Sequence, residues 1–129
     1  MRKAIRDQIK LILEPALLSE NPHTQIFSYC KGTIETGDPV VSIYLNTGDV
    51  TTYIDSEENA AQLDIAIYLP DQHNIDDALD TFGNLIQNTL RQQPNLNKNV
   101  IEQRHTRWTY DRTSFTGWTG LILTYTLNY

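Results

Sequence analysis

Hydrophobic residues alternate with polar or small residues in two segments of the chain, residues 62–70 and 118–129. The side chains of a β-strand point to opposite faces in turn, so this alternation predicts a strand in each segment. The core-facing positions are Leu63, Ile65, Ile67 and Leu69 in the first segment and Leu121, Leu123, Tyr125 and Leu127 in the second. Each strand is therefore expected to bury one face.

Two other segments repeat their hydrophobic residues at the spacing of an α-helix. Residues 2–14 predict an amphipathic helix, which either ends before Pro15 or continues with a kink to residues 21–22, because proline disfavours helical geometry in the residue before it. After Asn74, hydrophobic residues recur in steps of four, three, four and four. This stripe predicts a second helix, with the Asn74 side chain as its N-terminal cap.

Shorter extended patterns at residues 26–31, 40–45 and 100–110 predict three more strands. Residues 46–60 mix turn-forming and acidic residues with few apolar ones. They are expected to form a long loop or a weak hairpin, either used at an interface or simply mobile. Residues 111–117 are expected to form a polar loop before the last strand.

The order of helix, strands, helix and strands predicts the α+β class. We expect a single domain over residues 1–129, with a mostly antiparallel mixed sheet and two helices packed on one face. The positions expected on the other face are Tyr44, Tyr68, Ile122, Thr124 and Thr126. Their mixed character fits either a partner or plain exposure to solvent.

The chain is acidic and has a single cysteine. Sixteen acidic and ten basic side chains give a formal net charge of -6, which disfavours a groove that holds nucleic acid by neutralising phosphates. This charge fits either simple solubility or a channel that repels DNA. Cys30 forms no intramolecular disulfide and is expected to be buried as a small hydrophobic residue. With no export signal and no membrane-spanning apolar run, intracellular synthesis is expected.

No residue pattern of a known catalytic or cofactor site occurs in the sequence. The histidines lie far apart without zinc-ligand spacing, the glycines form no phosphate-binding loop, and the acidic residues lack the spacing of an EF-hand. We therefore expect no enzyme activity, no bound cofactor and no metal site. A carboxylate-dependent nuclease using Asp49, Asp55 or Glu57 is the least favoured alternative.

The most unusual local composition lies in residues 104–112, where arginines and large aromatic residues are interleaved. Such a stripe is able to stack on nucleic-acid bases, but Arg, Trp and Tyr are also enriched at protein–protein interfaces. The acidic loops of the same chain are its electrostatic complements. Self-association is therefore favoured over nucleic-acid binding.

Several segments taken together resemble a known family. The resembling segments are Gln62 to Pro70, the helix with an acidic start that follows, Trp108-Thr-Tyr-Asp-Arg112, and the terminal Trp118 to Tyr129. In order and spacing they are similar to the lambda-type phage minor tail protein U family, the tail terminators. Residues 40–45 also fall where that family has an earlier hydrophobic strand.

The resemblance implies a structural protein of a phage or prophage tail that assembles as a hexameric ring on the head-proximal end of the tail tube. Its implied partners are further copies of itself, the tail tube protein and the head–tail connector protein. DNA would pass through the ring without specific binding, and assembly would take place in the cytoplasm of the bacterial host. A related neck or head–tail completion ring protein is the alternative.

On the ring interpretation, charge alone suggests which residues meet between subunits. We expect acidic residues of one subunit to contact arginines of the next. The acidic residues are Asp49, Asp55, Glu57 and Glu58, and the arginines are Arg104, Arg107 and Arg112. Divalent ions would ease acidic crowding at this contact, so an ion dependence of assembly is open to test with EDTA.

Overall fold

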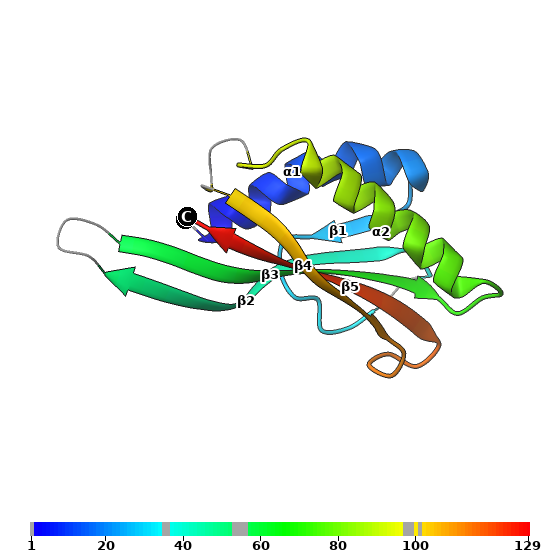
Figure 1. The fold of residues 1–129 in the computed structure, drawn as a ribbon. Coiled ribbons are helices and arrows are strands. Elements are labelled where there is room, and N and C mark those ends of the chain that lie inside the picture. Colours follow the sequence, from blue (N-terminus) through cyan, green and yellow to red (C-terminus); the bar gives the residue numbers. More distant parts are fainter. Residues whose placement is uncertain (1, 35–36, 53–56, 97–99, 101) are drawn as a thin grey trace.

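In the described part of the chain, a five-stranded mixed sheet carries two helices on one face (Figure 1). The computed structural model describes residues 2–34, 37–52, 57–96, 100 and 102–129. The elements in chain order are α1 (Arg2–Glu20), β1 (Gln25–Phe27), β2 (Val40–Thr52), β3 (Glu57–Pro70), α2 (Ile75–Arg91), β4 (Glu102–Asp111) and β5 (Trp118–Asn128). The strand order is β1-β2-β3-β5-β4, with β1 parallel to β2 and the other neighbours antiparallel. The predicted α+β fold is confirmed.

Helix α1 continues through Pro15 to Glu20, so the shorter of its two predicted ends is wrong. Proline removes the hydrogen bond to the carbonyl four residues earlier, which belongs to Leu11. Leu11 and Pro15 are both exposed, so water is able to take the place of the missing bond. The buried stripe of the helix runs across the proline and consists of Ile5, Ile9, Leu13 and Leu17. Packing therefore outweighs the local cost of the proline.

Helix α2 begins after Asn74, as predicted, but not through the predicted side-chain cap. Asn74 has a left-handed backbone with φ 60°, and its side chain makes no capping hydrogen bond. Asparagine tolerates this conformation better than most residues do. The acidic first turn, with Asp76 and Asp77, instead favours the positive end of the helix dipole. Within the described residues, neither helix is sufficiently long and apolar to cross a bilayer.

Strands β2 and β3 are much longer than predicted and form one hairpin. Most of residues 46–60 belongs to these strands, so the loop alternative is wrong and the hairpin alternative is confirmed; residues 53–56 lie outside the described residues. The pairing continues past a bulge between Leu45 and Thr47. We call residues 47–52 and 57–61 the arm, because this end of the hairpin projects beyond the rest of the sheet (Figure 1).

Strand β1 is shorter than its predicted range of 26–31. It lies at one edge of the sheet and pairs only with the first residues of β2, from Gln25 opposite Val40 to Phe27 opposite Ser42. The chain then leaves the sheet, and Cys30 lies exposed on this connection. The predicted burial of Cys30 is therefore wrong, because the strand that would have buried it ends too early.

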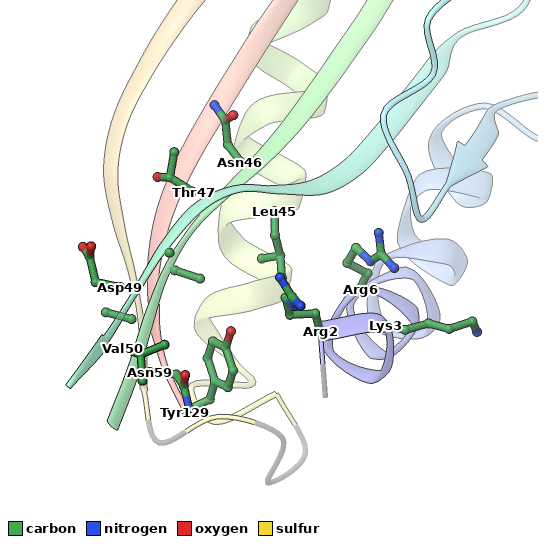
Figure 2. Close-up of a pocket in the computed structure, with 13 residues that line it drawn as sticks. Arg2, Lys3, Arg6, Leu45, Asn46, Thr47, Asp49, Val50, Asn59 and Tyr129 are labelled. Atoms are coloured by element: carbon green, nitrogen blue, oxygen red, sulfur yellow. The ribbon is translucent and has the colours of Figure 1, made fainter. Parts of the chain in front are cut away.

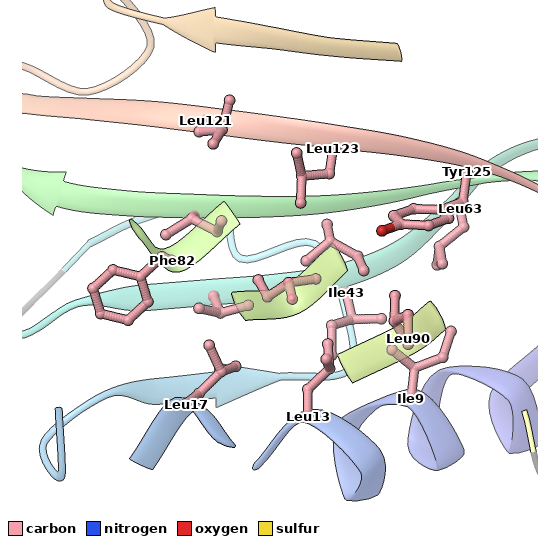
Figure 3. Packing of buried hydrophobic residues seen from close by; sticks show 14 of the residues in the cluster. Ile9, Leu13, Leu17, Ile43, Leu63, Phe82, Leu90, Leu121, Leu123 and Tyr125 are labelled. Atoms are coloured by element: carbon pink, nitrogen blue, oxygen red, sulfur yellow. The ribbon is translucent and has the colours of Figure 1, made fainter. Parts of the chain in front are cut away.

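The main core lies between the helices and the sheet (Figure 3). Side chains from α1, α2 and the three central strands interdigitate there, and the labelled ones are Ile9, Leu13, Leu17, Ile43, Leu63, Phe82, Leu90, Leu121, Leu123 and Tyr125. The alternating residues predicted to face the core in β3 and β5 are all buried. The hydrophobic pattern of the sequence therefore identifies the buried face of these strands correctly.

The face opposite the helices is only partly free. A second apolar cluster covers one end of it, built on Val40, Ala66 and Tyr68. Phe115, from the connection between β4 and β5, packs edge-on against the Tyr68 ring at 4.9 Å between centroids, and Tyr68 is 8% exposed. The prediction that Tyr68 lies on a free surface is therefore wrong, because connecting segments close over this end.

Candidate assembly surfaces

The uncovered part of the sheet is polar and carries two exposed arginines. Residues that pair across neighbouring strands share a face of the sheet. One such row crosses four strands, and it consists of Tyr44, Asp64, Thr124 and Arg107. We call this region the polar face and define it by Gln62, Asp64, Arg104, Arg107, Thr124 and Thr126.

A bulge in β4 places both arginines on the polar face. Arg104 and Arg107 are three residues apart, so in a regular strand they would point to opposite faces. The register shifts between His105 and Arg107, which leaves Arg104 opposite Thr126 and Arg107 opposite Thr124. The extra residue, Thr106, donates its hydroxyl to the Thr124 carbonyl oxygen at 3.2 Å. The sequence gives no direct signal of this bulge.

Asp64 is buried in the polar face without a basic partner. It is 5% exposed and accepts hydrogen bonds from Thr124 Oγ1 at 2.8 Å, Asn46 Nδ2 at 3.1 Å and Gln62 Nε2 at 3.5 Å. In the described part of the chain, neither Arg104 nor Arg107 forms an ion pair. The two arginines are thus exposed cations beside a carboxylate whose hydrogen bonds are already filled by neutral groups.

Arg112 occupies a different surface from the other two arginines. It donates two hydrogen bonds of 3.0 Å to Asp76 in the first turn of α2, and this contact lowers the pKa of Asp76. Tyr110 lies 4.8 Å below the guanidinium and donates its hydroxyl to Asp80 at 2.6 Å. That hydrogen bond raises the pKa of Tyr110 to about 12. Arg112 therefore joins the end of β4 to α2 within one chain.

Trp108 is exposed on the helix side of β4. It is 58% exposed and packs against Tyr110 with ring centroids 5.3 Å apart. A hollow of about 280 Å³ separates it from α2 and is also lined by Asp80 and Gln87. Residues 104–112 are one stripe in the sequence, but the structure divides them between both faces of the sheet.

A glycine that sequence reasoning missed lets Tyr68 cross the sheet. A Cβ atom on Gly120 would overlap the Tyr68 ring, so only glycine leaves room for that ring over β5. Tyr68 thereby reaches Asp111 on β4 and donates its hydroxyl to the carboxylate. Burial alone would raise the pKa of Asp111, but hydrogen bonds from Ser114, Tyr68 and the backbone N–H of Thr113 lower it to about 2.

An open hollow of about 1060 Å³ lies between the arm and the start of α1 (Figure 2). One wall is basic and comes from α1, with Arg2, Lys3 and Arg6. The other wall comes from the helix-facing side of the arm and includes Val50, which is 62% exposed. The only sequence signal of this hollow is the basic start of the chain, and nothing in the sequence connects that segment with the arm.

The predicted acidic interface residues belong mostly to the arm. Asp49 lies exposed in β2, Glu57 and Glu58 belong to the described part of β3, and Asp55 lies outside the described residues. The described residues hold no ion pair between the arm and the arginines of β4. Within those same residues, no group of three or more His, Cys, Asp or Glu side chains is placed to hold a metal ion.

The comparisons with known proteins concern the whole chain. A family model described as phage minor tail protein U matches residues 1–129. Among curated proteins, none matches this sequence. Among solved structures, a chain from the virion of a native gene transfer agent particle has a similar fold, with a TM-score of 0.55 at 9% identity over 95% of this chain and 92% of that one. At this identity the likeness concerns the fold alone.

Proposed function

This chain belongs to the phage minor tail protein U family, and from that membership we propose that it is the tail terminator of a phage tail. Copies close into a ring, taken as a hexamer, on the head-proximal end of the tail tube. The ring stops addition of further tube subunits and offers its other face to the head–tail connector. The observation that carries this proposal is the family match over all 129 residues.

The shape of the chain supports a ring. The arm projects from one end of the sheet, so an arm that packs on the body of a neighbouring copy meets a different surface there (Figure 1). Such a heterologous contact repeats from copy to copy and closes into a ring when the rotation between copies allows it. Closure limits the number of subunits, which suits a protein that ends a polymer.

The polar face supplies the receiving surface for the arm in this proposal. Arg104 and Arg107 are exposed on one face and form no ion pair in the described part of the chain. The acidic residues Asp49, Asp55, Glu57 and Glu58 of a neighbouring copy have the opposite charge. Arg112 is already bound to Asp76 within the chain, so its role between subunits requires that pair to be shared or opened.

DNA passage fits the charge of the chain. With a net charge of -6, the protein does not provide a strongly basic channel that would hold phosphates. The proposed role is non-enzymatic, and the related neck or head–tail completion ring is the alternative within the same class of proteins. A nuclease screen with Mg²⁺ on purified protein tests the enzymatic alternative, and light scattering with and without EDTA tests for an ion dependence of assembly.

Electron microscopy of tails assembled without this protein tests the proposal. We expect tail tubes of uncontrolled length, and normal length after purified wild-type protein is added during assembly. The arm variant Asp49→Lys/Glu57→Lys/Glu58→Lys is expected to restore length poorly, because like charges would then face Arg104 and Arg107 of the next copy. Tails of normal length in the absence of the protein would favour the neck alternative.

A further inference from the structure

The hollow beside α1 has a basic wall, and among the described residues only Lys3 of that wall forms an ion pair. The first turn of α1 contains Arg2 and Lys3 but no acidic residue, although the N-terminus of a helix already carries positive potential. Lys3 pairs with Asp7 at 2.6 Å. Arg6 Nε is buried without a hydrogen-bond partner among the described residues. Buried polar groups in proteins are nearly always paired, so this wall is suited to an acidic partner.

The opposite wall of the hollow is mixed, because Asn46, Asn59 and the exposed Asp49 line it together with the aliphatic Val50. Val50 projects from the arm with 62% of its surface exposed, and Tyr129 lies nearby at the end of the chain (Figure 2). An exposed aliphatic side chain beside a row of cations fits a partner that is acidic and partly apolar. These features suit the hollow to an acidic, partly apolar partner.

The same chain carries a surface of that chemistry at its other end. Helix α2 begins with the half-buried Ile75, which also packs against the main core, and continues with the acidic residues Asp76, Asp77 and Asp80. Arg112 forms an ion pair with Asp76, and the Tyr110 hydroxyl donates a hydrogen bond to Asp80 Oδ1 at 2.6 Å. The carboxylates of Asp76 and Asp80 are thus fixed in position by contacts within the chain. The carboxylate of Asp77, between them in the sequence, is exposed and has no partner among the described residues.

The basic and acidic ends are too far apart to neutralise one another within a chain. The two helices run in opposite directions over the sheet, so α2 begins at the end of the molecule away from the arm (Figure 1). Its 17 residues span about 25 Å, against a screening length of about 8 Å at physiological ionic strength. Any contact between these two surfaces therefore has to form between copies.

We propose that the hollow beside α1 receives the acidic start of α2 from a second copy. This inference rests on the proposed ring and specifies one of its contacts, in addition to the contact between the arm and the polar face. In it, Arg2, Lys3 and Arg6 face the carboxylates of the neighbour, while Val50 packs near the neighbour's Ile75. The contact is head-to-tail, as a closed ring requires.

Zero-length carbodiimide cross-linking tests this contact directly, because it joins a lysine amine only to a carboxylate that touches it. Full-length ¹⁴N and ¹⁵N chains are mixed and cross-linked, both free at high concentration and bound to tail tubes. We expect mixed-isotope peptides that link Lys3 to residues 75–80. Cross-links of Lys3 only to Asp7, or between chains only to the arm, would overturn the inference, and so would the absence of any Lys3 link in assembled rings.

Charge reversal sharpens the test. The variant Arg2→Glu/Arg6→Glu leaves the Lys3–Asp7 pair in place and is expected to lower the yield of the interchain cross-link by about tenfold. Asp77→Arg is expected to do the same, and mixing the two variants is expected to restore the yield, because each then offers the other a complementary surface. The matched control Lys10→Glu/Arg91→Glu also reverses two positive charges, but neither residue lines the hollow, so no loss is expected.

Failure of the inference and failure of the ring proposal give different results. If electron microscopy shows terminator rings on tubes while both reversal variants cross-link and cap tubes as the wild type does, the hollow is not the contact and the proposed function stands. If no ring forms and tail length is normal without the protein, the proposed function itself falls.

Discussion

The two faces of the sheet differ in side-chain composition: the helix side is aliphatic, and the opposite side is largely polar. On the helix side, long aliphatic side chains from every layer interlock, and Ile65 is completely buried. On the other side, short and polar residues such as Thr124 and Asp64 lie beside exposed arginines, and apolar packing is confined to one end. The first face holds the chain together, whereas the second leaves surface for contacts with other molecules.

The largest expected difference between the faces comes from shortening an isoleucine. Ile65→Ala is expected to lower the free energy of unfolding by about 2–5 kcal/mol, because it leaves a cavity under the helices. Ile122→Ala removes the same atoms from a partly exposed site on the other face and is expected to cost about 1 kcal/mol. Urea unfolding of both variants measures the contrast. Equal losses would mean that the second face contributes as much to folding as the first.

A smaller effect is expected where the second face is tightly packed. Gly120→Ala places a Cβ atom against the Tyr68 ring and is expected to cost about 1–3 kcal/mol, because the ring is displaced from Asp111. Gly32→Ala is the control, since its added Cβ meets no atom within 4 Å. Thermal unfolding followed by circular dichroism compares the two. A stable Gly120→Ala variant would show that Tyr68 has room to move.

A modest pH effect is expected from Asp111. Its pKa is about 2 in the folded chain and about 4 when unfolded, so the carboxylate stabilises the fold fully above about pH 4, and this contribution is lost as the pH falls toward 2. Solvent screening limits it to less than about 1 kcal/mol. We expect the difference in unfolding free energy between wild type and Asp111→Asn to shrink between pH 5 and pH 3. A difference that is constant over this range would contradict the assignment.

The smallest effect on stability is expected at Arg112. Its ion pair with Asp76 is half exposed, so Arg112→Gln is expected to leave the melting temperature almost unchanged. If Arg112→Glu reduces the amount of ring seen by native mass spectrometry, the loss is then due to a contact between subunits and not to unfolding. Arg112→Asp with Asp76→Arg keeps the pair in reverse and serves as the control. An unchanged ring in all variants would remove Arg112 from the interface.

The hydrophobic pattern predicts most of the fold, because buried positions recur at the period of a strand or a helix. The alternating residues of β3 and β5 and the stripe of α2 all face the core as expected. The pattern failed where backbone pairing decided the structure. Residues 46–52 lack apolar alternation, yet they form a strand because their backbone pairs with β3, and no side chain records that pairing.

The candidate surfaces were predictable by charge but not by position. Charge is visible residue by residue, so the sequence alone identifies the acidic segment and the arginines. The bulge at Thr106, the separation of Arg112 from Arg107 and the hollow beside Arg6 all depend on how distant segments meet. Such relations appear only when the register of the sheet and the direction of the helices are known.

The bulge at Thr106 has a second effect besides orienting two arginines. Strand β4 is the last strand of the sheet, so its outer backbone groups are open to pairing with any other extended chain. An irregular edge strand that also carries charged residues is a poor template for such pairing. A molecule whose proposed task is to halt the growth of a tube is thereby protected from seeding an endless fibre of its own.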